Sequence, residues 1–227
     1  MILLITILST VFILSFWLGT SEKFKLEQLS KKRIIHGLFF LLIMLTIMSV
    51  ANFMDMLAQR SAAYITMGLY SIVAGFFSGS GYKLMQLNKK SGHLKYVHQS
   101  FWSRVAPNMM IILIVTFGIY KTGLLTLNFT GVDITSGISL ICFGFWGWTL
   151  NIVPQFRSDN ILFLDQSIDW DNVASYKWVT EESLQIDYYN KTGLLTDFRT
   201  FIPPDDQLIV ERLLSDKVKD KELETED

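Results

Sequence analysis

The sequence predicts an α-helical polytopic membrane domain of about five transmembrane helices, followed by a small α+β domain with an antiparallel sheet and a C-terminal helix. Half of the 227 residues are apolar, only 18% are charged, and the mean hydropathy is +0.34. Soluble chains carry about 25% charged residues, so this composition favours a membrane protein. The long apolar runs stop near Pro154, and a period of two then takes over. We therefore expect a transmembrane domain (1–154), a cytoplasmic domain (155–218) and a disordered tail (219–227).

Five apolar runs are long enough to cross a bilayer, which requires about 20 helical residues. They cover residues 2–18, 34–54, 62–84, 106–120 and 138–153. The first has no basic residues before it and no small-residue cleavage site after it, so we interpret it as a retained span. The fifth is rich in tryptophan, and an interfacial position is the alternative for it.

Basic residues in the short loops predict the orientation, because Lys and Arg accumulate on the cytoplasmic side of a membrane. The loop 19–33 carries five of them, and the loop 85–105 together with Lys83 carries another five. The turns 55–60 and 121–137 each hold one base and one acid. We therefore expect a multi-pass cell-membrane protein with its N-terminus outside and its C-terminal domain in the cytoplasm.

Small residues recur every four positions in the third run, at Ser71, Gly75 and Gly79. Such a face lets another helix approach closely, which predicts packing within this chain or, as the alternative, a homo-oligomer. Asp55 and Arg60 are expected to pair across the turn before this run. No run carries a charged residue near its centre, so a transporter component is the least favoured function.

Patterns typical of catalysis and metal binding are missing from the sequence. The histidines are His36, His93 and His98, and the single cysteine is Cys142. His93 and His98 have no acidic or cysteine neighbour, so we interpret them as parts of a solvated loop. There is no Walker A, GxSxG, HExxH or GxGxxG motif. We therefore expect no enzymatic activity, no catalytic residue, no cofactor and no bound metal.

The C-terminal domain shows the short extended segments, separated by turns, that are typical of a small sheet. Extended segments are indicated at 161–164, 168–170, 177–180, 184–189 and 194–202. Pro203 and Pro204 end the sheet, and Asp205 and Asp206 open a helix whose positive end favours acids. A sheet with one apolar face must be covered, and this helix is the local candidate.

The stretch SIDWDNVASYKW (167–178) fits the pattern I-x-W-(D/E)-x-(I/V)-x-S-Y-x-W, and a hairpin, an Ile-Pro pair and a helix follow it. This order resembles the short bacterial PH-like domain of unknown function found in small membrane proteins of Gram-positive bacteria. The resemblance covers about residues 158–216 and implies a PH-like half-barrel with no assigned activity. The membrane region shows no such resemblance. The expected structural core of the domain comprises Ile168, Trp170, Tyr176, Trp178, Ile202 and Pro203.

Charge is divided unevenly along the chain. Residues 1–154 carry 12 bases and 4 acids, whereas the remainder carries 8 bases and 17 acids, a net charge of −9. An anionic leaflet should repel such a domain. We hypothesise that it docks on the protein's own loop near Lys89, Lys90 and Lys95, or on a basic protein partner. Solubility alone is the alternative role of its charge, since exposed ion pairs are weak and screened.

The favoured function is a non-enzymatic integral membrane protein whose acidic cytoplasmic domain mediates protein contacts or regulates the membrane domain. An alternative is an immunity factor that protects the cell against membrane-active peptides, which rests on analogy with small multispan proteins that carry PH-like domains. The lipid bilayer is an expected partner, and nucleic acid is not.

Overall fold

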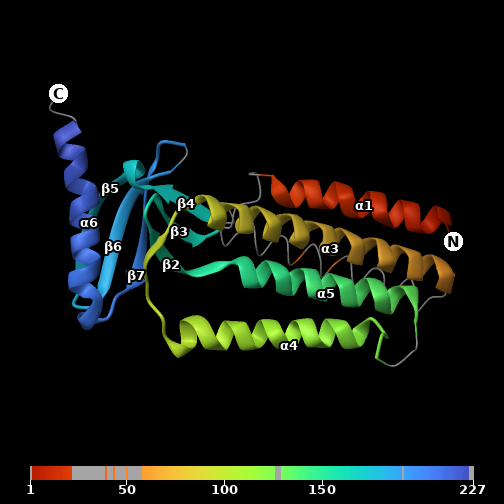
Figure 1. Ribbon diagram of the computed structural model, residues 1–227. Helices are drawn as coiled ribbons and strands as arrows, with labels where there is room; N and C mark the ends of the chain where they lie inside the picture. The colour runs from red at the N-terminus through yellow and green to blue at the C-terminus, as the bar shows by residue number, and fades with distance from the viewer. Residues whose placement is uncertain are drawn as a thin grey trace. The chain divides into compact units, whose positions relative to one another are not determined.

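The computed structural model describes residues 2–21, 58–125, 129–190 and 192–224, together with the isolated positions 39, 43 and 50. Helices and strands follow one another along these residues as Figure 1 shows. The helices are α1 (Ile2–Thr20), α3 (Gln59–Lys90), α4 (Ala106–Lys121), α5 (Gly131–Thr149) and α6 (Pro204–Glu224), with a π-helical turn η2 (Phe101–Val105) and a 3-10 turn η3 (Trp170–Asn172). The strands are β1 (Leu94–Val97), β2 (Asn151–Arg157), β3 (Asn160–Leu164), β4 (Gln166–Asp169), β5 (Val173–Thr180), β6 (Ser183–Tyr189) and β7 (Leu195–Phe201).

The chain forms two compact units that alternate along the sequence. The helical unit comprises Met1–Met85 and Pro107–Leu150, and the sheet unit comprises Gln86–Ala106 and Asn151–Asp227. The expected division at residue 154 differs from these units, because it left the segment 86–106 in the membrane domain. That segment contains β1, which pairs with β2 and so satisfies backbone groups that a loop would leave to water.

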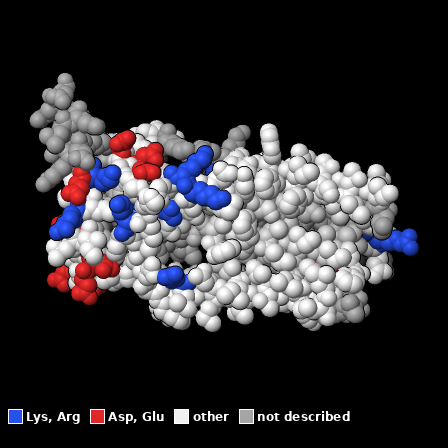
Figure 2. Space-filling model, viewed as in Figure 1, with Lys and Arg blue, Asp and Glu red and all other residues white. Residues whose placement is uncertain are grey.

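Three helical segments of the described chain are long and apolar enough to cross a membrane, as judged by length and composition. They are α1, α3 and the segment Phe101–Lys121, which joins η2 to α4. Large apolar side chains stay exposed on them, among them Trp17 at 78% and Leu113 at 66%. On the face seen in Figure 2, charged side chains gather over the sheet unit, whereas the helical unit is almost uncharged. An apolar exposed surface of this extent suits lipid rather than water.

The expected spans 2–18, 62–84 and 106–120 coincide with α1, α3 and α4. The expected span 34–54 lies outside the described residues apart from Phe39, Ile43 and Val50, and so does Asp55, the expected partner of Arg60. The helix expected at 138–153 has different limits, since α5 covers Gly131–Thr149 and the strand β2 begins at Asn151. At its end Leu150 already has extended backbone angles, and Asn151 pairs with Leu164 of β3.

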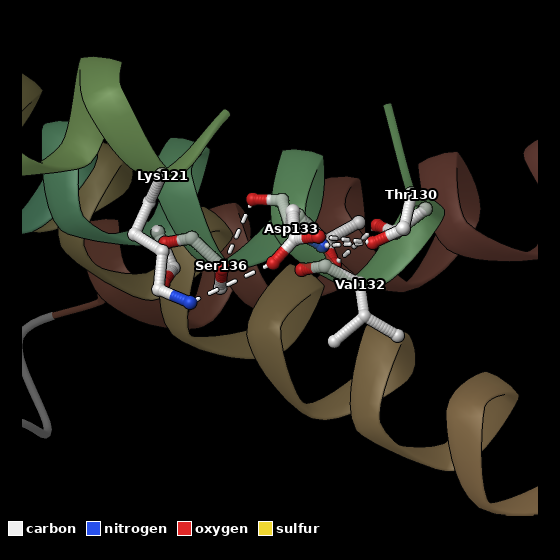
Figure 3. A network of polar contacts seen from close by, with 8 residues as sticks. Lys121, Thr130, Val132, Asp133 and Ser136 are labelled. Carbon is white, nitrogen blue, oxygen red and sulfur yellow. Dashed lines mark hydrogen bonds and ion pairs between the residues drawn. The ribbon is translucent and has the colours of Figure 1, made fainter. Parts of the chain in front are cut away.

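A polar network explains why α5 begins at Gly131 rather than later (Figure 3). Thr130 is the N-cap, because its hydroxyl oxygen accepts a hydrogen bond from the Asp133 backbone amide at 3.1 Å. The Asp133 carboxylate also lies 3.6 Å from the Lys121 ammonium at the end of α4. An acid in the first turn of one helix and a base in the last turn of another both complement the helix dipoles.

The small-residue face of α3 lies against α1. A side-chain carbon at Gly79 would stand 2.1 Å from the Phe16 carbonyl oxygen, and one at Gly75 would stand 2.3 Å from that of Phe12. The Ser15 hydroxyl donates to the Ile72 carbonyl at 2.6 Å, which adds a hydrogen bond between the two helices. Only small residues allow backbones to approach this closely, so α1 occupies this face of α3 in the structure.

The sheet unit contains two antiparallel sheets. The first has the strand order β1-β2-β3-β4, and the second has the order β5-β6-β7. The turn η3 joins the sheets, with β4 entering it and β5 leaving it. Both sheets, the turn η3 and the helix α6 contribute to one apolar core, which comprises Phe156, Ile161, Ile168, Trp170, Val173, Leu184, Ile186, Tyr188, Phe198, Ile202, Val210 and Leu214.

Helix α6 closes this core from the C-terminal end of the chain. Pro204 is its first residue and Asp205 and Asp206 lie in its first turn, an arrangement that suits a helix N-terminus. Val210 and Leu214, one turn apart, are completely buried in the core. Leu213 packs against the core as well, whereas Leu208, Ile209, Glu211 and Arg212 are exposed, and this orientation shapes the surface described below.

Trp170 should be essential to the sheet unit, because its side chain is only 7% exposed and its indole N–H donates to the Arg157 carbonyl at 3.0 Å. We predict that Trp170→Ala lowers the free energy of unfolding of this unit by about 3–5 kcal/mol. Thermal unfolding of the purified protein in detergent measures the loss. The matched control is Trp148→Ala in α5, where the indole is 71% exposed. Equal effects of the two substitutions would contradict the assignment of Trp170 to the core.

Candidate functional site

Arg157, at the end of β2, holds the segment that follows α3 against the first sheet. Its Nη1 donates to the carbonyls of Asn88 at 2.8 Å and Gly92 at 3.2 Å, and its Nε and Nη2 both donate to the Gln155 side-chain oxygen. All of these acceptors are neutral. Burial lowers the pKa of Arg157 from its ordinary value, since a cation in this position has lost part of its water without gaining a carboxylate.

Gly92 allows the chain to leave α3 and enter β1 at close range. Its φ of +70° is favourable only for glycine, and a side-chain carbon there would lie 2.1 Å from the Ser158 hydroxyl oxygen. The same hydroxyl accepts a hydrogen bond from the His93 amide at 3.0 Å, and the Ser158 amide donates to the His93 carbonyl at 2.9 Å. The β2–β3 turn and the β1 segment are thereby fixed to each other.

Asn160 completes this anchor from β3. Its side-chain amide donates to the Ser91 hydroxyl at 3.0 Å and to the Ser167 hydroxyl at 2.7 Å, and Asn160 and Ser91 are both buried. Ser91 in turn donates to the Leu87 carbonyl at 2.6 Å, in the last turn of α3. Buried polar groups that are paired in this way specify one arrangement of the elements that carry them.

A further hydrogen bond ties α6 to β1. The Tyr96 hydroxyl donates to the Asp206 carboxylate at 2.9 Å, and the Tyr96 ring lies 5.9 Å from that of Phe156. Burial and, after it, the hydrogen bond to Asp206 raise the pKa of Tyr96 well above its ordinary value. The first turn of α6 is therefore fixed relative to the sheet.

These contacts create an open groove of about 550 Å³ between the β1–β2 corner and the outer face of α6. We call it the basic groove. Its lining residues are Lys95, Arg157, Ser158, Leu208, Ile209, Arg212, Leu213, Asp216 and Lys217. Four of them are bases and one is an acid, although the sheet unit as a whole carries 12 bases and 17 acids. Positive charge is therefore concentrated at this one place on an acidic unit.

No carboxylate among the described residues neutralises the bases of the basic groove by direct contact. Within the described residues, none of Lys95, Arg157, Arg212 and Lys217 lies within ion-pair distance of a carboxylate. Between them the groove exposes aliphatic side chains, with Leu208 at 78% and Ile209 at 56% exposed. Unpaired cations beside exposed aliphatic groups can recognise an anionic ligand that also has apolar parts.

In the part of the chain that the structure describes, no three His, Cys, Asp or Glu side chains come together as a metal site would require. Cys142 is a free thiol within α5. The His98 ring packs against Phe201 with ring centres 5.4 Å apart, and His36 lies outside the described residues.

The residues singled out from the sequence lie in three places. Ile168, Trp170 and Ile202 are buried in the core of the sheet unit, Tyr176 and Trp178 pack against it, and Pro203 is half-buried before α6. Ser71, Gly75 and Gly79 are buried in the helical unit. Lys89, Lys90 and Lys95 lie in the sheet unit itself, at the end of α3 and in β1, so they are not a separate surface on which that unit docks.

The sequence interpretation missed Arg157, Arg212 and Lys217 as parts of a site. Each is an isolated base among acids, and the groove joins them only through the packing of α6 and β2. One available signal was the pair Leu208-Ile209, which together with buried Val210 makes α6 apolar on more than one face. Such a helix has more apolar surface than its own sheet can cover.

Comparison of this chain with protein families, with curated proteins and with solved structures gives no match.

The burial of Tyr96 and its hydrogen bond to Asp206 should make the free energy of unfolding decline at alkaline pH. Unfolded tyrosine ionises near pH 10, whereas folded Tyr96 keeps its proton to higher pH. The stability that this proton contributes is fully present below about pH 10 and is lost as the pH rises toward the folded pKa. We predict that Tyr96→Phe costs about 1 kcal/mol at neutral pH and flattens the alkaline decline. Thermal unfolding from pH 7 to 11 tests this, and parallel curves for the two proteins would contradict it.

Proposed function

We propose that this chain is an integral protein of the cell membrane with five spans, its N-terminus outside and its sheet unit in the cytoplasm. The exposed apolar surfaces of α1 and α4 support residence in a bilayer. The C-terminus of α3, the N-terminus of α4 and the C-terminus of α5 all continue into the sheet unit, which fits helices that cross in alternating directions. Ten bases in the loops 19–33 and 83–105 support a cytoplasmic position for that side.

The sheet unit is proposed to be a non-enzymatic PH-like module that mediates protein contacts or regulates the helical unit. The observation that carries this function is the connectivity of the two units. The chain passes between them three times, at residues 85/86, 106/107 and 150/151. Only three residues separate α3 from β1, three separate β1 from η2, and one separates α5 from β2.

Such connectivity favours regulation over simple tethering. A module that serves only as a tethered adaptor needs one flexible linker, whereas three short connections tie any shift within the sheet unit to α3, α4 and α5. Sheets of four and three strands followed by a closing helix support the PH-like part of the proposal. The basic groove supports the binding part, because it offers a surface that is both charged and apolar.

The orientation can be tested with single cysteines in a Cys142→Ser background. We predict that Leu125→Cys, in the turn after α4, reacts with an impermeant maleimide added to intact cells. Ala174→Cys, on β5 of the sheet unit, should react only after the membrane is permeabilised. Both positions are exposed, so the contrast reports the side of the membrane rather than burial. The opposite labelling pattern would refute the proposed topology.

Contacts of the sheet unit can be tested by photo-cross-linking in intact membranes. A photoreactive residue at Lys177, Leu195 or Arg212 should yield cross-linked peptides identifiable by mass spectrometry, either from another protein or from the chain's own loop 19–33. The matched control is the same residue at Leu125, which is also exposed but lies in the helical unit. If no position on the sheet unit gives more product than Leu125, the module does not mediate contacts.

A further inference from the structure

On the basis of the function proposed above, we further infer that the basic groove binds a short acidic segment of a partner protein, with apolar residues at helical spacing among its carboxylates. The inference rests on three features of the groove: its local charge, its aliphatic floor and its size. The charge and the aliphatic residues concern different side chains and can be tested separately.

Local charge selects the sign of the ligand. Lys95, Arg212 and Lys217 are exposed and reach the groove from β1 and from α6. Arg157 lies deeper, and four of its five N–H groups are already donated to neutral oxygens. One Nη2 hydrogen and the whole positive charge remain for a ligand. A carboxylate placed here would gain a charge-assisted hydrogen bond, and Asp216 is the one acid among the described residues that line the groove.

The aliphatic floor of the groove, which is formed by Leu208 and Ile209, favours a ligand that also has apolar side chains. Leu208 and Ile209 immediately precede Val210, which α6 buries in the core. Because Val210 and Leu214 hold the helix in this rotation, Leu208 and Ile209 cannot turn inward. Adjacent exposed aliphatic residues next to a groove are typical of a surface that a partner covers.

The size of the groove fits a segment and not a folded domain. Its volume of about 550 Å³ lies within the range of ~300–1,000 Å³ that is common for small ligand sites. A folded partner would bury roughly 800 Å² on each side, which calls for a broader face. A short amphipathic helical segment, whose apolar side chains recur at spacings of three and four residues, matches the groove better.

Surrounding acids favour a discrete segment over an anionic bilayer. Asp205, Asp206 and Glu211 lie on α6, the helix that also carries the groove bases Arg212 and Lys217. The sheet unit has a net charge of −5 from its 12 bases and 17 acids. A lipid surface is extended and would face these carboxylates as well as the groove, with repulsion as the result. A narrow peptide meets only the groove.

A binding assay on the full-length protein in nanodiscs of zwitterionic lipid tests the inference. The probe is a fluorescent peptide of about 12 residues with Glu and Leu at helical spacing, and the control probe replaces every Glu with Gln. We expect Arg212→Glu to weaken binding of the acidic peptide by about tenfold, since an attraction becomes a repulsion. The matched variant Lys177→Glu makes the same charge change on exposed β5, outside the groove, and should alter binding by less than about twofold.

The aliphatic floor has its own variant. Leu208→Ser should weaken peptide binding by about threefold or more while leaving thermal unfolding unchanged, because this side chain is 78% exposed. Unchanged unfolding separates a lost contact from a damaged fold. Binding should also decline as salt is raised, which follows from the charged contacts.

Several outcomes would overturn the inference. Equal binding of the Gln peptide, or equal effects of Arg212→Glu and Lys177→Glu, would show that the groove charges are not used. Stronger Arg212-dependent binding of the protein to phosphatidylglycerol vesicles than to the peptide would identify a lipid surface as the ligand instead. If cross-links form at Lys177 or Leu195 but the peptide does not bind, the groove assignment fails while the proposed contact function stands.

Discussion

The hydrogen bonds that anchor the segment after α3 to the first sheet are the constraint on which the sheet unit depends. Arg157, Ser158 and Asn160 come from one corner of the sheet, and they satisfy carbonyls, an amide and a hydroxyl at the end of α3 and the start of β1. A strand of only four residues has little intrinsic stability, so β1 needs these contacts in addition to its ladder with β2. Without them the sheet would lose its edge strand, and Lys95 and Tyr96 would lose their positions.

The basic groove is a consequence of the same anchor. Arg157 serves two purposes, since it binds the neutral carbonyls of Asn88 and Gly92 and also lines the groove. Tyr96, on the anchored strand, holds the first turn of α6 through Asp206. Core packing of Val210 and Leu214 then determines which residues of α6 point outward. The site is therefore built from the same interactions that keep two distant chain segments in one unit.

The local parts of the fold were predictable from the sequence, and the non-local parts were not. Apolar run length was enough to find α1, α3 and α4. A short apolar run was enough for the strand around Ile161, and alternation was enough for the strand around Ile186. The strand β1 was overlooked because its four residues, Leu94–Val97, lie among lysines and histidines, and its partner β2 lies more than fifty positions away.

The strand β2 was hidden by its apolar residues Ile152 and Val153, which continue the run of α5 without a charge between them. A helix was expected to persist there, but a register shift in β2 accommodates Pro154, which could not pair regularly in a central strand.

The net charge of the sheet unit favours a basic partner, whereas the local charge of its groove favours an acidic one. The two charges must therefore be considered separately. Residues 155–227 carry 17 acids against 8 bases, from which a basic partner was expected. Folding adds four bases from the segment 86–106, of which Lys95 enters the groove beside Arg157, Arg212 and Lys217. Coulomb interactions between exposed charges fade over about 10 Å at ordinary salt, so a ligand in the groove senses these four bases more strongly than acids elsewhere on the unit. The total charge of the sheet unit determines whether an extended surface such as a bilayer attracts or repels it. The charges lining the groove determine which small ligand the groove can bind.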